Sequence, residues 1–270
     1  MQTLSHKFHS ASYYLSRPRF WSHFCHRGLG YLGSKEGDKT VAMATAWARK
    51  QARPAAQTLA FLDIVPEAAE PLPRFPVSEM QAAADRVRTT GARMGGGANV
   101  DLLYALAVLT RPRNVVETGV AFGWSSLAIL KALSENGEGR LASVDRPYPG
   151  DKTERFVGAA VPDRLKQPWT IIREPDRNGL KRALKLFPEG LDLAHYDSDK
   201  TSYGRRFGYG LLWSGLKEGG LFVSDDIQDN LAFAQFVKEQ QAPFGVIETE
   251  GKFVGLAVKP RRARRASRIF

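Results

Sequence analysis

The sequence predicts an α/β protein built on a doubly wound, seven-stranded, mostly parallel sheet, and three observations support this. Seven short β-rich runs recur after residue 113. Helical patterns separate most of them, and such alternation indicates βαβ units. Only Gly251 joins the last two runs, too short a link for a crossover, so these should form an antiparallel hairpin at the sheet edge. The runs are 114–119, 140–145, 169–174, 191–197, 219–226, 244–250 and 252–259.

Helices are expected between these runs and ahead of them. Before the first run, residues 38–62 read as helix broken at Pro54, and residues 66–78 hold four prolines and read as a linker. A second helix begins near Ser78, a glycine group interrupts it, and a third follows from Asn99. We therefore expect three regions: a basic N-terminal arm with a helical cap and linker (1–93), a core domain (94–259) and a basic tail (260–270). Between the runs, helices are expected within 125–136, 178–187, 203–216 and 230–240.

The net charge of +11 is concentrated at the two ends of the chain. Residues 1–35 carry five Lys or Arg and no acid, residues 251–270 carry seven and no acid, and residues 36–250 hold 27 basic and 28 acidic residues. A neutral body argues against a cationic binding cleft, whereas the termini could contact an anionic surface or be solvated tails.

Localisation has only indirect signals. The single cysteine, Cys25, excludes an intramolecular disulfide and fits a reducing compartment, so we predict a cytoplasmic protein. No apolar run is long enough for a membrane span. Residues 1–35 also resemble a transit peptide loosely, and they equally suit an arm on a membrane surface or over an active site.

A glycine-containing loop, ETGVAFGWSS (117–126), follows the first predicted strand. Gly119 and Gly123 allow a tight turn and close approach of a ligand to the backbone, and Ser125 opens the next helix, whose amides favour polar ligands. Ala121 occupies the middle glycine position of G-x-G-x-x-G, which disfavours a nicotinamide or flavin dinucleotide. No Gly-Lys-Ser/Thr follows, so the loop is not a Walker loop either.

The second predicted strand ends in Asp145, 28 residues after Glu117. An acid at this place can accept hydrogen bonds from both ribose hydroxyls of a nucleoside, although it could also cap a turn or helix. Glu117, Gly119, Gly123 and Ser125 followed by Asp145 together resemble the S-adenosylmethionine (SAM) site of class I methyltransferases, which are Rossmann-like. The resemblance covers roughly residues 94–259, and it implies that Trp124 lies beside the cofactor.

Three acids should meet at the carboxyl ends of the fourth and fifth strands. Asp197 ends the fourth, and Asp225 and Asp226 end the fifth. Crowded carboxylates repel and raise one another's pKa, and a hard cation such as Mg²⁺ relieves this repulsion. The alternative for the pair at 225–226 is a loop cap or a SAM contact without metal.

The pattern Asp197, Lys200, Tyr203 and the later acidic pair resembles the cation-dependent small-molecule O-methyltransferases of the catechol and caffeoyl-coenzyme A type. Asp226 stands where those families usually have Asn, a change that some sugar and macrolide O-methyltransferases tolerate. The resemblance implies Mg²⁺ on Asp197, Asp225 and Asp226, with a substrate hydroxyl bound to it.

Lys200 is the residue expected to act as general base, provided that burial and the metal depress its pKa. The alternative is a surface lysine in the first turn of a helix capped by Asp199. His195, on the same strand face as Asp197, is expected to be buried and hydrogen-bonded rather than catalytic.

The leading functional prediction is therefore a SAM-dependent, Mg²⁺-assisted O-methyltransferase acting on a small hydroxylated molecule, with a homodimer possible. A second candidate is an RNA or protein methyltransferase that uses its basic tails. A third is a SAM-binding partner subunit without catalysis.

Overall fold

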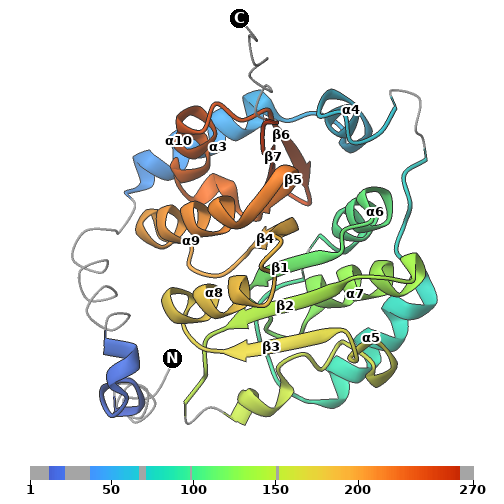
Figure 1. Cartoon of the computed structure of the whole chain (residues 1–270), viewed down its shortest axis with the longest axis vertical. Coiled ribbons are helices and arrows are strands. Elements are labelled where there is room, and N and C mark those ends of the chain that lie inside the picture. Colours follow the sequence, from blue (N-terminus) through green and yellow to red (C-terminus); the bar gives the residue numbers. More distant parts are fainter. Residues whose placement is uncertain (1–11, 22–36, 67–70, 98, 150–151, 262–270) are drawn as a thin grey trace, which may run out of the picture.

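A seven-stranded sheet in the order β3-β2-β1-β4-β5-β7-β6 forms the centre of the protein in the computed structural model (Figure 1). The structure describes residues 12–21, 37–66, 71–97, 99–149 and 152–261. The predicted α/β fold is confirmed, and each predicted strand is present. The strands are β1 (Asn114–Thr118), β2 (Arg140–Asp145), β3 (Trp169–Arg173), β4 (Leu191–Tyr196), β5 (Leu216–Ser224), β6 (Phe244–Thr249) and β7 (Lys252–Val258).

The first five strands all pair with one another in parallel. Strand β7 pairs antiparallel with both β5 and β6. The register sets Glu117 of β1 beside His195 of β4, and His195 beside Val223 of β5. The predicted hairpin is confirmed, with Gly251 in its turn at a φ of 77°. After β5 the chain first forms β6 at the edge of the sheet and then returns as β7, which pairs between β5 and β6.

Two helical layers cover the two faces of the sheet (Figure 1). Side chains alternate along each strand, so Val115 and Leu193 enter one core while Val116 and Ala194 enter the other. The first core is covered by α6 (Val100–Thr110) and α7 (Trp124–Asn136). The second lies under α8 (Asp176–Lys185), α9 (Ser202–Gly215) and α10 (Ala232–Glu239).

The N-terminal helices flank the core domain. The predicted break at Pro54 is confirmed, because α3 (Asp38–Gln51) ends before it and α4 (Ala55–Phe61) begins after it. Helix α3 packs against β6 and the short helix η4 (Ile227–Asp229). Helix α5 (Val77–Thr89) follows the predicted linker. None of the helices within the described residues has the length and apolar character that crossing a membrane requires.

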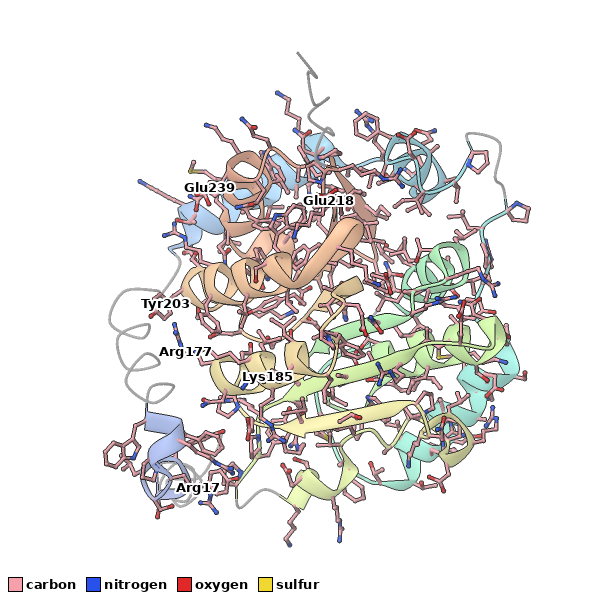
Figure 2. The ribbon with its side chains drawn as sticks, in the orientation of Figure 1. Arg17, Arg177, Lys185, Tyr203, Glu218 and Glu239 are labelled. Atoms are coloured by element: carbon pink, nitrogen blue, oxygen red, sulfur yellow. The ribbon has the colours of Figure 1, made fainter. Side chains whose placement is uncertain are left out.

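Residues 12–21 pack beside the carboxyl ends of β2 and β3. The ring of Phe20, in the short helix η1 (Pro18–Phe20), is fully buried. The Tyr14 hydroxyl donates to the Pro147 carbonyl at 3.2 Å, and the Asn178 side chain donates to the Arg19 carbonyl at 2.9 Å. Arg17 marks this segment in Figure 2. The rest of the basic arm (1–11 and 22–36) and most of the basic tail (262–270) lie outside the described residues.

Candidate active site

A large cavity of about 1030 Å³ opens at the carboxyl ends of the parallel strands. Its wall is formed by the loops that follow β1, β2, β3, β4 and β5, together with the glycines after α5 and residues of the β6–β7 hairpin. Eight of the ten predicted site residues line it: Gly119, Trp124, Ser125, Asp145, Asp197, Lys200, Asp225 and Asp226.

The glycine loop is fixed by its contact with the end of β4. Gly119 has a φ of 80°, and a Cβ there would clash with the carbonyl oxygen of Asp197. The Asp197 amide donates to the Thr118 carbonyl at 3.1 Å, which holds the two loops together. Only glycine fits this backbone conformation and close approach, so the loop can lie directly against the end of β4.

Gly123, the second predicted glycine, is the N-cap of α7 at a φ of 85°. It does not line the cavity, because it packs against the backbone of Gly158, whose Cα would lie 3.1 Å from a Cβ at this position. Its role is to let α7 start immediately behind the loop. Trp124 and Ser125, the first residues of that helix, do face the cavity.

Glu117 does not line the cavity either, and this departs from its predicted place beside the cofactor. Its carboxylate is fully buried and accepts hydrogen bonds from the hydroxyls of Ser126 and Ser143, the latter at 2.6 Å. Serines on α7 and β2 thus hold Glu117 beneath the loop. The sequence places this acid at the end of a strand but does not reveal that the side chain points into the protein.

Asp145 lies at the cavity wall and is almost fully buried. Burial raises the pKa of its carboxyl group, and an ion pair with Arg173 and a 3.3 Å contact from the Tyr148 hydroxyl oppose that rise. Arg173 also pairs with Glu154 at 2.6 Å. Arg173 was missed by the sequence analysis, because nothing in its local pattern shows which acid it contacts.

The three predicted metal ligands line the same cavity, as the adjacency of β4 and β5 leads one to expect. Lys200 lies between two of them. Its Nζ forms an ion pair with Asp197 Oδ1 and lies 2.9 Å from Asp226 Oδ2. Lys252, on the β6–β7 hairpin, lies 3.5 Å from the other oxygen of Asp226. The carboxylates are therefore neutralised by ammonium groups of the same chain.

The third acid, Asp225, faces His195 instead. His195 Nε2 lies 3.4 Å from Asp225 Oδ2, and its Nδ1 lies 3.8 Å from Glu117 Oε2. The predicted burial of His195 is confirmed, but neither ring nitrogen has a well-aligned hydrogen bond within the described residues. Burial alone would lower the pKa of this imidazole, yet the two carboxylates, chiefly Asp225, raise it to about 10.

The ion pairs of Asp197, Asp225 and Asp226 decide whether these three residues fit the predicted magnesium ion. Three carboxylates are a suitable donor set for Mg²⁺, and Asp225 Oδ1 is buried with no hydrogen-bond partner among the described residues. However, the described part of the chain contains no group of three His, Cys, Asp or Glu side chains arranged to hold a metal ion. The oxygens of Asp197 and Asp226 converge on Lys200 instead. The residues as arranged do not fit the ion.

The pKa of Lys200 was expected to be depressed by burial and by a bound metal ion. Burial by itself would lower the pKa of the ammonium group, but the pairs with Asp197 and Asp226 outweigh it and raise that pKa above its ordinary value. Its two carboxylate partners therefore hold Lys200 in the ammonium form. For Asp197, burial and the nearby charge of Asp225 raise the pKa of the carboxyl group despite Lys200.

The start of α9 also differs from the prediction in one residue. Thr201, not Asp199, is the N-cap, because its hydroxyl accepts from the Gly204 amide at 3.0 Å. Asp199 accepts from the Thr201 amide and hydroxyl at 3.0 and 2.8 Å, so it fixes the cap. Lys200 thus lies just outside the helix, not in its first turn as the alternative had it.

Two further cavity residues were not identified from the sequence. Asp176, at the start of α8, accepts from the Ser198 hydroxyl at 2.5 Å, and burial raises its pKa to about 6. Arg177 lies over the rings of Tyr203 and Phe207, with its Cζ 5.0 and 4.3 Å from their centroids. Figure 2 shows Arg177 and Tyr203 together at the facing ends of α8 and α9. An acid directly after the third strand was the available signal for Asp176.

Comparison with known proteins agrees with this architecture. Residues 116–227, which contain the glycine loop and all three acids, match the family described as "Methyltransferase domain". No curated protein matches the chain by sequence. Residues 116–227 are therefore similar in sequence to a methyltransferase domain.

Solved structures show the same fold at low sequence identity. An O-methyltransferase from Bacillus cereus in complex with SAH is 14% identical, with a TM-score of 0.54 over 78% of this chain and 100% of its own. A putative O-methyltransferase from Klebsiella pneumoniae is 15% identical, with a TM-score of 0.53 over 80% and 100%. The O-methyltransferase TomG from Streptomyces achromogenes, in complex with SAM and involved in tomaymycin synthesis, is 17% identical, with a TM-score of 0.51 over 70% and 92%. These likenesses show that the chain shares the fold of these solved structures.

Proposed function

We propose that this chain, whose residues 116–227 match a methyltransferase domain, transfers the methyl group of SAM to a hydroxyl group of a small molecule. The observation that carries the proposal is that one cavity combines three features. They are the glycine loop, an acid placed to bind a ribose (Asp145), and the acid–lysine cluster, by which we mean Asp197, Lys200, Asp225 and Asp226. Its volume of about 1030 Å³ is at the upper end for small-molecule sites, which leaves room for a cofactor and an acceptor together.

SAM would bind along the carboxyl ends of β1 and β2. Gly119 in the loop, and Trp124 and Ser125 in the first turn of α7, line this part of the cavity. Asp145 would accept hydrogen bonds from the ribose hydroxyls. Gly123 and the buried Glu117 would support the loop from behind, since neither reaches the cavity. The SAH and SAM named for two of the similar structures support this choice of cofactor.

The acceptor hydroxyl would bind between SAM and the acid–lysine cluster. In the reaction its proton passes to the Asp197 carboxylate, whose raised pKa makes it a better base than a solvated aspartate. A lone pair of the acceptor oxygen forms the new bond to the methyl carbon. The carbon–sulfur bond breaks, its electron pair stays on sulfur, and the products are S-adenosylhomocysteine and a methyl ether.

Lys200 would stabilise the negative charge that develops on the acceptor oxygen. An ammonium group has three N–H donors, of which two are directed at Asp197 and Asp226. The third can donate to an oxygen in the cavity, and a fixed donor aimed at developing charge is an effective catalytic device. In this proposal Lys200 acts as a fixed donor in place of a general base, because its pairs with Asp197 and Asp226 favour the ammonium form.

Magnesium assistance, predicted from the sequence, has no step in this mechanism. Asp197, Asp225 and Asp226 are the residues that would hold the ion, and their oxygens are directed at Lys200, Lys252 and His195. The homodimer, the cytoplasmic location and contact of the basic termini with an anionic surface remain predictions.

Two measurements test the proposed function. Isothermal titration calorimetry should show that SAM binds the purified protein. Consumption of SAM should then be followed against catechols, sugars and polyketide hydroxyls, with and without Mg²⁺. We expect Asp197→Ala to lose methyl transfer while it still binds SAM and keeps its fold. Failure to bind SAM, or turnover that is the same in Asp197→Ala, would refute the proposal.

A further inference from the structure

The feature of interest is the distribution of charge around the three clustered acids. Within the described residues each carboxylate has a basic side chain beside it. Lys200 lies between Asp197 and Asp226, Lys252 lies on the far oxygen of Asp226, and His195 faces Asp225. The acids come from the ends of β4 and β5, and the basic groups come from three separate segments: strand β4, the loop before α9, and β7.

We propose that the ammonium group of Lys200 is the built-in cation of this acidic site, so that the protein activates its acceptor without a divalent metal ion. This inference rests on the proposed function, because it assigns the cation that assists that same methyl transfer. The inference concerns only which positive charge balances the carboxylates of the site.

The position of Lys200 supports the proposal because the residue is anchored at its backbone. The Asn230 side chain donates to the Lys200 carbonyl at 2.7 Å, and the helix cap at Thr201 follows directly. The side chain of Lys200 therefore extends from a fixed backbone position, and its ammonium group pairs with both Asp197 and Asp226. A flexible surface lysine would have no such restraint.

The second argument is competition for the same oxygens. A dication bound by Asp197 and Asp226 would have to displace the Lys200 ammonium, and the two positive charges would then repel at short range. Lys252 would add to this repulsion, since it lies 3.5 Å from Asp226 Oδ1. Carboxylates that already have ammonium partners gain less from a metal ion than unpaired carboxylates do.

The chain offers a matched control for testing this. Lys217 pairs with Asp192 at 2.7 Å, and its side chain is 35% exposed, the same fraction as that of Lys200. Asp192 lies in the first half of β4, away from the cavity. Lys217→Met therefore removes an equivalent lysine–aspartate pair without touching the acidic site.

The experiment measures binding of Mn²⁺ alone, a paramagnetic stand-in for Mg²⁺, by the loss of its free-ion electron paramagnetic resonance signal. Full-length wild-type protein, Lys200→Met and Lys217→Met are each titrated after treatment with chelator and dialysis. We expect no specific binding by the wild type or Lys217→Met at millimolar Mn²⁺. Lys200→Met, which leaves the carboxylates without their ammonium partner, should bind Mn²⁺ specifically. Its affinity should be at least about tenfold higher than the limit that the titration sets for the wild type.

One outcome would overturn the inference and requires no substitution of a lysine. If the wild type binds one Mn²⁺ and Asp197→Asn abolishes that binding, the site is a metal site and Lys200 is displaced. Because this result needs only the wild type and Asp197→Asn, it stands even if Lys200→Met does not fold. Calorimetric titration of the same samples with SAM separates the two proposals, because absence of SAM binding refutes the proposed function whatever Mn²⁺ does.

Discussion

Gly119→Ala measures how tightly the glycine loop is held against the end of β4. Gly119 and Gly137 both have positive φ, 80° and 76°. A Cβ at Gly119 would clash with the Asp197 carbonyl, whereas no atom lies within 4 Å of a Cβ at Gly137. The Gly137→Ala variant therefore isolates the backbone penalty, and the difference between the two variants reports the crowding.

The expected magnitudes follow from these environments. An alanine at positive φ costs about 1–2 kcal/mol of the free energy of unfolding, partly offset by about 0.4–1 kcal/mol from the less flexible unfolded chain. Crowding against backbone adds about 1–3 kcal/mol at Gly119 alone. Since a chain of this size loses about 2–4 °C of Tm per kcal/mol, Gly119→Ala should melt clearly below Gly137→Ala.

Urea unfolding and thermal melting of the two variants provide the stability comparison, and calorimetry provides the SAM affinity. Gly119→Ala should also weaken SAM binding, because relieving the clash moves the loop that faces the cofactor. Gly137→Ala, at the far end of α7, should leave SAM affinity unchanged. Equal destabilisation by both substitutions would show that the close approach of the loop to Asp197 does not constrain the protein.

The other predictions concern the charged groups of the cavity. Asp145→Asn should weaken SAM binding about 10- to 100-fold in calorimetry, the loss expected for charge-assisted hydrogen bonds, and an unchanged Kd would remove Asp145 from the cofactor site. Lys200→Met should lower kcat about 100-fold or more through loss of a fixed donor to the developing oxyanion, with Lys217→Met as the unaffected control; equal rates would contradict the assigned role. Asp176 has a pKa raised to about 6, so its contribution to stability is present at low pH and is lost as pH rises through that value. Urea unfolding of Asp176→Asn between about pH 4 and pH 7 should accordingly show a smaller loss of stability with rising pH than the wild type, and identical slopes would contradict the assignment.

Much of the fold was predictable because alternation of apolar runs and helical segments is a local property of the sequence. The acids at the ends of β4 and β5 were also predictable as neighbours, since adjacent parallel strands end at one edge of the sheet. The pairing of Lys200 with Asp226 was not, because it depends on side chains from two separate loops. The sign of the Lys200 pKa shift follows from that pairing, so it could not be predicted from the sequence either.

The direction of side chains at the ends of strands was the second feature that could not be predicted from the sequence. Glu117 ends a strand, as do Asp145 and Asp197, but its carboxylate turns inward to Ser126 and Ser143. Strand position alone does not decide between cavity and interior for an end residue, because the backbone turns there. Likewise, a hairpin at the sheet edge was predicted, whereas the placing of β7 next to β5 depends on long-range pairing.

The position of β7 has a consequence for how the protein can be assembled during its synthesis. Asp225 and Asp226 directly follow strand β5, whose outer edge pairs with β7, and β7 comes after the other six strands of this sheet in the chain. Until residues 252–258 emerge, β5 has an open edge, and Lys252 cannot reach Asp226. A nascent chain can thus form the β1–β4 half of the sheet early, while the acidic half of the cavity is completed only after β7 has been synthesised.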